Sequence, residues 1–195
     1  LYIVDRNYLL NFGLPDYDPN INITHHATIG RITRFTADSQ TNFTTVIPDS
    51  RKILLGQTVE GTYPVLFTSH GVGSLVFGND GTLLASFGDA GSWKTHDRGS
   101  AEETYYLEAI DEGIIREKEN IGSFKSMFLD NVAGKVIRID PATGEGLSSN
   151  PFFDPAAPNA PRSKVWASGF RNPFKMIYLN GTGSHFPEEG NPGIF

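Results

Sequence analysis

The chain has 195 residues, enough to bury a substantial core, and its 21 glycines, 12 prolines and 12% aromatic residues suit a turn-rich β protein. A formal net charge of −6 argues against a nucleic-acid partner, because binding a phosphate backbone needs concentrated Lys and Arg. The sequence has no Cys, which excludes disulfides and Cys-ligated metals, and it has no apolar run of membrane-spanning length.

Short strand patterns recur along the chain and are separated by turn-forming clusters. Eight segments have this character: Leu1–Val4, Arg31–Thr36, Lys52–Leu55, Ser74–Phe77, Thr82–Phe87, Gly134–Asp140, Lys164–Ser168 and Phe174–Leu179. Short strands at regular intervals, separated by turns, favour a sandwich, a barrel or a propeller. Because both ends read as strand-like, we expect residues 1–195 to be one partial domain, truncated at both ends.

The clearest local signal is a β-hairpin. The apolar runs Leu75–Phe77 and Leu83–Ala85 flank Gly78–Gly81, and Asp-Gly between apolar runs is typical of a tight hairpin turn. Two strands that run out and back bring His70 and Asp89, at the two ends of this segment, to the same end of the sheet. A carboxylate beside an imidazole fixes its tautomer and favours its protonated form, so the pair is a candidate general base.

One helix is predicted from Ser100 to about Glu112. Ser100 and Glu103 have the spacing of a capping box, and Gly113 can end the helix in a left-handed conformation. The helix lies in a long connection, about residues 90–133, and connections of that length often shape a binding mouth. Its acidic residues are most simply a solvated face, partly stabilised by the helix N-terminus. They are Glu102, Glu103, Glu108, Asp111 and Glu112.

Four segments occur in a characteristic order between about residues 30 and 180. They are Gly30–Thr36, His70–Asp89, Gly134–Pro141 followed by Ser149–Phe152, and Val165–Phe174. Together they resemble the glucose/sorbosone dehydrogenase-like family, the soluble quinoproteins also called pyrroloquinoline-quinone (PQQ)-dependent sugar dehydrogenases. The resemblance implies an all-β fold, a six-bladed β-propeller with four antiparallel strands per blade, of which this chain would supply about half.

The resemblance also implies an activity and a site. In the family, the residue at the position of His70 is the general base for oxidation of a sugar at its anomeric carbon, and the residue at Asp89 pairs with it. Arg171 and Asn172 match residues that lie against PQQ, where a fixed guanidinium stabilises charge on a quinone oxygen. The resemblance further implies Ca²⁺, with no ligand assigned to this chain, an external electron acceptor, and a periplasmic or extracellular location.

Each of these residues also has a structural reading. His70 can be a buried structural histidine, and Asp89 can cap a turn after Gly88. Arg171 can tie a loop through backbone carbonyls, and Asn172 can form an Asx turn before Pro173. The alternative function is therefore a non-catalytic extracellular propeller that binds a protein or glycan partner, because fold does not fix function.

Two further patterns resemble metal sites, but neither predicts one. Asp16–Asn20 begins like a calcium-binding loop, but Ile21 stands where that loop needs Gly, and Ala27 stands where it needs Glu. The adjacent residues His25 and His26 would face opposite sides of a strand and could not hold one metal together.

Overall fold

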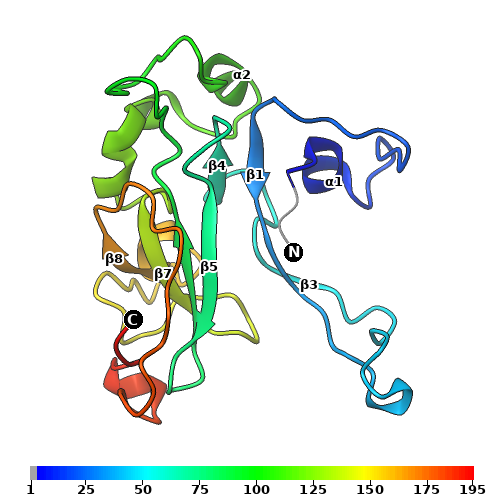
Figure 1. Ribbon diagram of the computed structural model, residues 1–195, viewed down its shortest axis with the longest axis vertical. Coiled ribbons are helices and arrows are strands. Elements are labelled where there is room, and N and C mark those ends of the chain that lie inside the picture. The colour runs from blue at the N-terminus through cyan, green and yellow to red at the C-terminus, as the bar shows by residue number, and fades with distance from the viewer. Residues whose placement is uncertain (1–3) are drawn as a thin grey trace.

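The computed structural model describes residues 4–195, which form short strands joined by long loops and a few short helices (Figure 1). The strands are β1 (Thr28–Gly30), β2 (Ile32–Arg34), β3 (Lys52–Leu55), β4 (Tyr63–Val65), β5 (Val72–Phe77), β6 (Leu83–Phe87), β7 (Lys135–Ile139) and β8 (Val165–Ser168). The α-helices are α1 (Arg6–Asn11), α2 (Tyr106–Asp111) and α3 (Pro161–Lys164). The 3-10 helices are η1 (Ser39–Thr41), η2 (Glu117–Glu119), η3 (Gly122–Met127) and η4 (Pro187–Glu189).

Strands β5, β6, β7 and β8 form one four-stranded antiparallel sheet in chain order. This is the arrangement of one propeller blade, and it confirms the all-β, partial-propeller prediction. Within residues 4–195 the other strands form two two-stranded sheets, β1–β4 and β2–β3, and the sheets do not close into a ring. Figure 1 shows the blade on one side and the β2–β3 arm extending away from it toward η1.

The predicted hairpin joins β5 to β6. Its turn is closed by hydrogen bonds from the Gly78 amide to the Thr82 carbonyl (2.9 Å) and from the Gly81 amide to the Gly78 carbonyl (3.1 Å). Gly81 has a φ of +76°, a conformation that costs glycine little. The Asp80 side chain accepts hydrogen bonds from the Thr82 amide and hydroxyl, which fixes the turn.

The core lies between one face of the blade and the two smaller sheets. All five residues of β6 and all five of β7 are buried, so both faces of these central strands are covered. Phe87 of β6 stacks on Tyr63 of β4 at 5.2 Å between ring centroids, and both side chains are almost completely buried. This packing joins the blade to the preceding sheet, and it holds the end of β6 where Asp89 follows.

The opposite face of the blade contains a buried ion pair. Arg138 of β7 donates to Asp80 Oδ2 at 2.7 Å, and neither side chain has any exposed area. Burial alone would raise the pKa of Asp80, but hydrogen bonds from Thr82 and Arg138 hold it below its ordinary value. Arg138 also donates to the Pro187 carbonyl and the Ser149 hydroxyl, so one side chain joins the hairpin, β7 and the C-terminal segment.

The predicted helix is wrong in its start. Helix α2 begins at Tyr106, and Ser100 has a φ of +54° with its amide bonded to the Asn120 side chain rather than capping a helix. The expected partner Glu103 instead accepts a hydrogen bond from the Ser92 hydroxyl at 2.5 Å. The predicted end is confirmed, because Gly113 follows the helix with a φ of +70°.

The prediction of a solvated acidic face is also wrong in part. Glu102 and Asp111 are exposed. Glu108, by contrast, accepts hydrogen bonds from the Ala27 amide (2.7 Å) and the Arg6 side chain (3.1 Å), and Glu112 is paired with Arg6. These contacts attach α2 to α1 and to the start of β1, which nothing in the local sequence indicated.

Two predicted strands have other outcomes. The one at Leu1–Val4 lies outside the described residues except for Val4, which is not in a strand. Phe174–Leu179 does not form a strand, because it crosses the face of the blade instead of pairing with its edge. Its backbone is held by side-chain hydroxyls: Ser86 donates to the Pro173 carbonyl at 2.8 Å, and the Met176 amide donates to Ser74 at 3.0 Å.

Candidate functional site

His70 and Asp89 meet at the open end of the β5–β6 hairpin. Nδ1 of His70 lies 2.9 Å from Oδ1 of Asp89, as the hairpin pattern predicted. The His70 side chain is 10% exposed and that of Asp89 is 1% exposed, so the pair is shielded from water but not sealed. A carboxylate is an acceptor only, so a hydrogen bond between these two atoms places a proton on Nδ1 of the imidazole.

Gly88 makes this approach possible. A Cβ atom at Gly88 would lie 2.1 Å from the carbonyl oxygen of His70 and would clash with it, so this close approach of the two backbones requires a glycine. The Gly88 amide donates to the Gly71 carbonyl at 2.8 Å, which continues the hairpin pairing past the assigned strands. His70 itself has a φ of +53°, and the Tyr63 hydroxyl donates to its carbonyl. The backbone at His70 is therefore held in an unusual conformation by contacts from two sides.

Arg171 completes the cluster from the loop after β8. Its Nη1 lies 3.3 Å from Asp89 Oδ2 and donates to the Ser123 hydroxyl at 2.9 Å, and its Nη2 donates to the Ser92 carbonyl at 3.2 Å. Its backbone carbonyl accepts from the Asp89 amide at 2.9 Å. Arg171 thus ties a loop through a carbonyl, as the structural reading expected, and it also contacts the carboxylate that holds His70.

The ends of β6, β7 and β8 carry these residues to one place. The Gly134 amide, just before β7, donates to the Gly88 carbonyl at 2.7 Å, and the Phe170 amide donates to the Gly134 carbonyl at 3.0 Å. The ladder of the blade thus continues beyond its strands to the site. A Cβ at Gly134 would lie 2.6 Å from the Phe170 carbonyl, so this approach also depends on a glycine.

Asn172 is exposed, and its side chain makes no hydrogen bond with residues 4–195. The expected Asx turn does not form, because the Phe174 amide donates to the Asn172 backbone carbonyl at 2.8 Å. The amide group therefore remains available to a ligand beside Arg171, whose side chain is 51% exposed. A half-exposed guanidinium and a free amide are a donor set that fits the oxygens of an anionic quinone.

Several polar residues of the site were not predicted from the sequence. Asp97 accepts hydrogen bonds from the Ser92 and Gly99 amides, and the Cβ position of Gly91 lies 3.2 Å from Asp89 Oδ1 and 3.4 Å from Asp97 Oδ2. Two buried carboxylates therefore flank Gly91. Both lie at the start of the long connection between β6 and β7.

A buried lysine lies behind the same cluster. Lys125 in η3 is 1% exposed and donates to the Gly122 carbonyl at 2.7 Å. Burial lowers the pKa of Lys125, while the charges of Asp97 and Asp89 oppose that shift. In the sequence Lys125 stands between Phe124 and Ser126 in a segment of mixed polarity, and no local signal identified it as buried.

Among residues 4–195 no group of three or more His, Asp or Glu side chains could hold a metal ion. No described residue is therefore assigned to Ca²⁺. In the same part of the chain no helix combines the length and apolar character needed to cross a bilayer.

The four-stranded sheet is one blade of a partial propeller, and an imidazole, a carboxylate and a guanidinium meet at one end of it. The chain belongs to the Glucose / Sorbosone dehydrogenase family, whose sequence model matches residues 30–193. This membership confirms the family predicted from the four segments and places the chain among the sugar dehydrogenases, which are oxidoreductases. No curated protein matches the chain.

Proposed function

We propose that this protein oxidises an aldose at its anomeric carbon, with PQQ as the cofactor and His70 as the general base. The observation that carries the proposal is the contact of His70 with Asp89, which in turn contacts Arg171. Family membership supplies the reaction class, and the cluster supplies residues with the chemistry that this reaction needs.

In this proposal His70 removes the proton of the anomeric hydroxyl. Asp89 accepts a hydrogen bond from Nδ1–H, which leaves Nε2 as the free base that takes the substrate proton. As the O–H bond breaks, its electron pair forms the second C–O bond and the anomeric hydrogen leaves as hydride, which gives the lactone. The imidazolium that results is stabilised by the buried carboxylate.

Arg171 and Asn172 are proposed to hold the cofactor. The guanidinium faces partly to solvent and is oriented by Ser123, Ser92 and Asp89, so it is fixed before any ligand binds. When bound, the quinone would accept the hydride, and a fixed positive charge beside it stabilises the negative charge that develops. We further propose Ca²⁺ assistance, reoxidation by an external electron acceptor, and a periplasmic or extracellular location, all from the family.

The test is to add PQQ and Ca²⁺ to the protein and to follow dye reduction with a panel of aldoses. Turnover that is lost in His70→Ala and retained in His185→Ala, an exposed histidine in the C-terminal segment, supports the proposal. The absence of turnover with every aldose would contradict it and would favour a non-catalytic propeller that binds a protein or glycan.

A further inference from the structure

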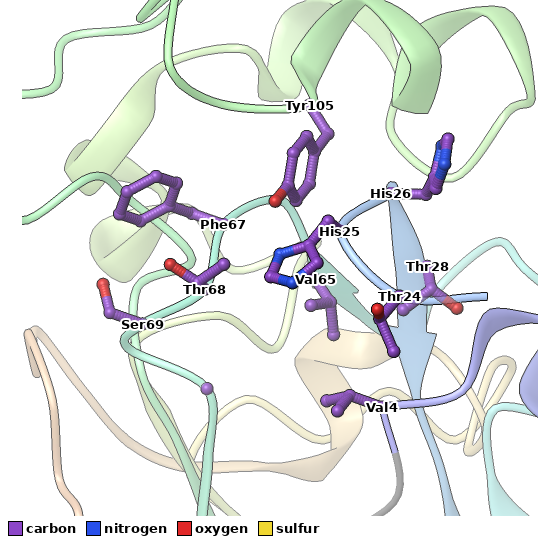
Figure 2. Close-up of a pocket in the computed structure, with 11 residues that line it drawn as sticks. Val4, Thr24, His25, His26, Thr28, Val65, Phe67, Thr68, Ser69 and Tyr105 are labelled. Atoms are coloured by element: carbon purple, nitrogen blue, oxygen red, sulfur yellow. The ribbon is translucent and has the colours of Figure 1, made fainter. Parts of the chain in front are cut away.

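A polar pocket of about 290 Å³ lies between β3, the turn after β7 and the end of α3. Its polar lining residues are Gln57, Thr58, Glu60, Thr143, Asn159 and Lys164, and no residue of the His70 cluster lines it. The pocket in Figure 2, beside β1 and β4, has a similar volume of about 310 Å³, but no lysine lines it. The pocket at α3 is therefore distinguished by its amine.

Lys164 is buried in this pocket without a hydrogen-bond partner. The residue is 5% exposed, and its side chain makes no hydrogen bond with residues 4–195. A buried ammonium normally has partners for its donors, because burial of an unpaired charge is costly. Burial accordingly lowers the pKa of Lys164 to about 8, against the opposing charge of Glu145. Part of this amine is therefore uncharged at neutral pH, with its lone pair free.

The Lys164 amine is accessible from the pocket. Among the described residues, the side-chain polar atoms that are both sealed from solvent and without a partner belong to Thr28, Arg51 and Ser69. Nζ of Lys164 also lacks a partner but is not one of these sealed atoms. Since Lys164 lines the pocket, a small molecule that enters the pocket can reach Nζ.

The other buried lysines of residues 4–195 lack this combination. Lys125 is 1% exposed and donates to the Gly122 carbonyl at 2.7 Å. Burial lowers the pKa of Lys135 further than that of Lys164, to about 7, but Lys135 is fully buried and donates to the Ala133 carbonyl at 2.7 Å. Access and the missing partner, rather than burial alone, set Lys164 apart.

The charges around the pocket favour a neutral ligand over an anion. Glu60 lines the pocket from an exposed position, and the charge of Glu145 acts on Lys164. Glu145 also accepts a hydrogen bond from Asn159 at 3.3 Å, which fixes it beside the pocket. Two carboxylates near one amine repel an anion, and they stabilise a cation formed at Nζ. The hydroxyl and amide groups of the lining suit a hydroxylated molecule.

We infer that Lys164 is a covalent modification site whose amine forms an imine with small neutral hydroxyaldehydes that enter this pocket. The Nζ lone pair forms a C–N bond to the aldehyde carbon, the C=O π pair moves to oxygen, and a proton passes from nitrogen to that oxygen. This hydroxyl then leaves with the remaining Nζ proton as water, and a C=N bond forms, so the step needs no oxidant or reductant. The inference does not depend on the proposed function, because the pocket shares no residue with the His70 cluster.

The reaction is tested with glycolaldehyde and cyanoborohydride, which reduces the imine to a stable secondary amine. Peptide mass mapping of the protein at pH 7.5 gives the initial labelling rate of each lysine. We expect Lys164 to be labelled at least about tenfold faster than the exposed Lys52, because a far larger share of its amine is uncharged at this pH. Labelling of Lys164 that is no faster than that of Lys52 would overturn the inference.

Two further arms test the pocket and the ligand class. Thr58→Trp, at an exposed position of the pocket lining, should slow labelling of Lys164 at least about fivefold and leave Lys52 unchanged, whereas the exposed substitution Thr44→Trp should change neither rate. Glyoxylate, an anionic aldehyde of the same carbon number, should show no preference for Lys164. An unchanged rate in Thr58→Trp would exclude entry through the pocket, and an equal preference with glyoxylate would exclude selection of a neutral aldehyde.

Discussion

The carboxylate of Asp89 lies 2.9 Å from the imidazole of His70 although the two residues are 19 positions apart in the chain. The same carboxylate accepts a hydrogen bond from the Gly91 amide at 2.9 Å and lies 3.3 Å from the guanidinium of Arg171. Asp89 is thus the buried centre of the candidate site, and His70 and Arg171 are positioned against it from two different strand ends.

Replacing Asp89 with Asn should lower kcat by about 10²–10⁴-fold, the usual range for loss of general acid–base function. The side chain keeps its shape but loses the charge that stabilises the imidazolium and orders Arg171. The check is the pH–rate profile, in which the limb that falls toward low pH, where a general base becomes protonated, should move or disappear. A normal profile and rate would show that Asp89 serves only to cap its turn.

His70→Ala should lower the turnover rate about 10²–10⁴-fold, while cofactor binding stays largely intact. The change removes the base and leaves the Arg171 contacts to Ser123 and Ser92 in place. Cofactor binding is measured by titration of absorbance with PQQ. Unchanged activity would remove His70 from the mechanism.

Gly88→Ala should disturb the site more than it disturbs the fold. The new Cβ would lie 2.1 Å from the His70 carbonyl, so the backbone that carries His70 must move, at a cost of about 1–3 kcal/mol in stability. We expect turnover to fall at least as strongly as thermal stability. Gly81→Ala is the control, because it strains only the hairpin turn, where no atom lies within 4 Å of the added Cβ. Full activity in Gly88→Ala would show that the His70–Asp89 geometry is not needed.

Arg138→Met should lower the free energy of unfolding by about 3–5 kcal/mol, because it leaves the buried carboxylate of Asp80 without its partner. Arg162→Met removes the exposed ion pair with Asp130, in which the side chains are 48% and 41% exposed, and should cost no more than about 1 kcal/mol. Denaturant unfolding measures both changes. Equal effects of the two substitutions would contradict a structural role for the buried pair.

Lys135 makes the stability depend on pH. Burial lowers its pKa from 10.5 to about 7, so between these values the unfolded chain retains a proton that the folded protein has lost. The free energy of unfolding should therefore rise with pH above 7, by up to about 1.4 kcal/mol per pH unit.

Lys135→Met should show a less steep rise than the wild type; part of the rise remains because burial also lowers the pKa of Lys125 and Lys164. The variant also loses hydrogen bonds to the carbonyls of Lys125 and Ala133, but that loss does not vary with pH. Denaturant unfolding between pH 7 and 9 gives the two slopes, with the exposed substitution Lys52→Met as control. Parallel slopes for the wild type and Lys135→Met would show that Lys135 stays charged in the folded protein.

Much of the blade could be predicted because its signals are local. The turn at Gly78–Gly81 and the apolar runs beside it determine a hairpin from a few residues, and Lys52–Leu55 was predicted with the bounds that the structure has. The contact of His70 with Asp89 followed from the same reasoning, since the two ends of a hairpin must meet.

Other elements depend on partners that are distant in sequence. Strands β1 and β4 have three residues each, β4 contains a proline, and their pairing is what makes them strands. Ser100 and Glu103 have the spacing of a helix cap, but Asn120 and Ser92 compete for these groups and the helix starts later. Local spacing could not reveal these competitors.

The β5–β6 hairpin, the imidazole–carboxylate pair at its open end and the family could all be predicted from the amino-acid sequence, because each depends on residues close together in the chain or on short motifs. The folded chain alone revealed that Ser92 and Ser123 hold Arg171 beside this pair, that Lys125 is buried behind it, and that Glu108 attaches α2 to the start of β1. Burial and hydrogen-bond partners are properties of the packed chain, and the same residue types in an unpacked segment carry no such information.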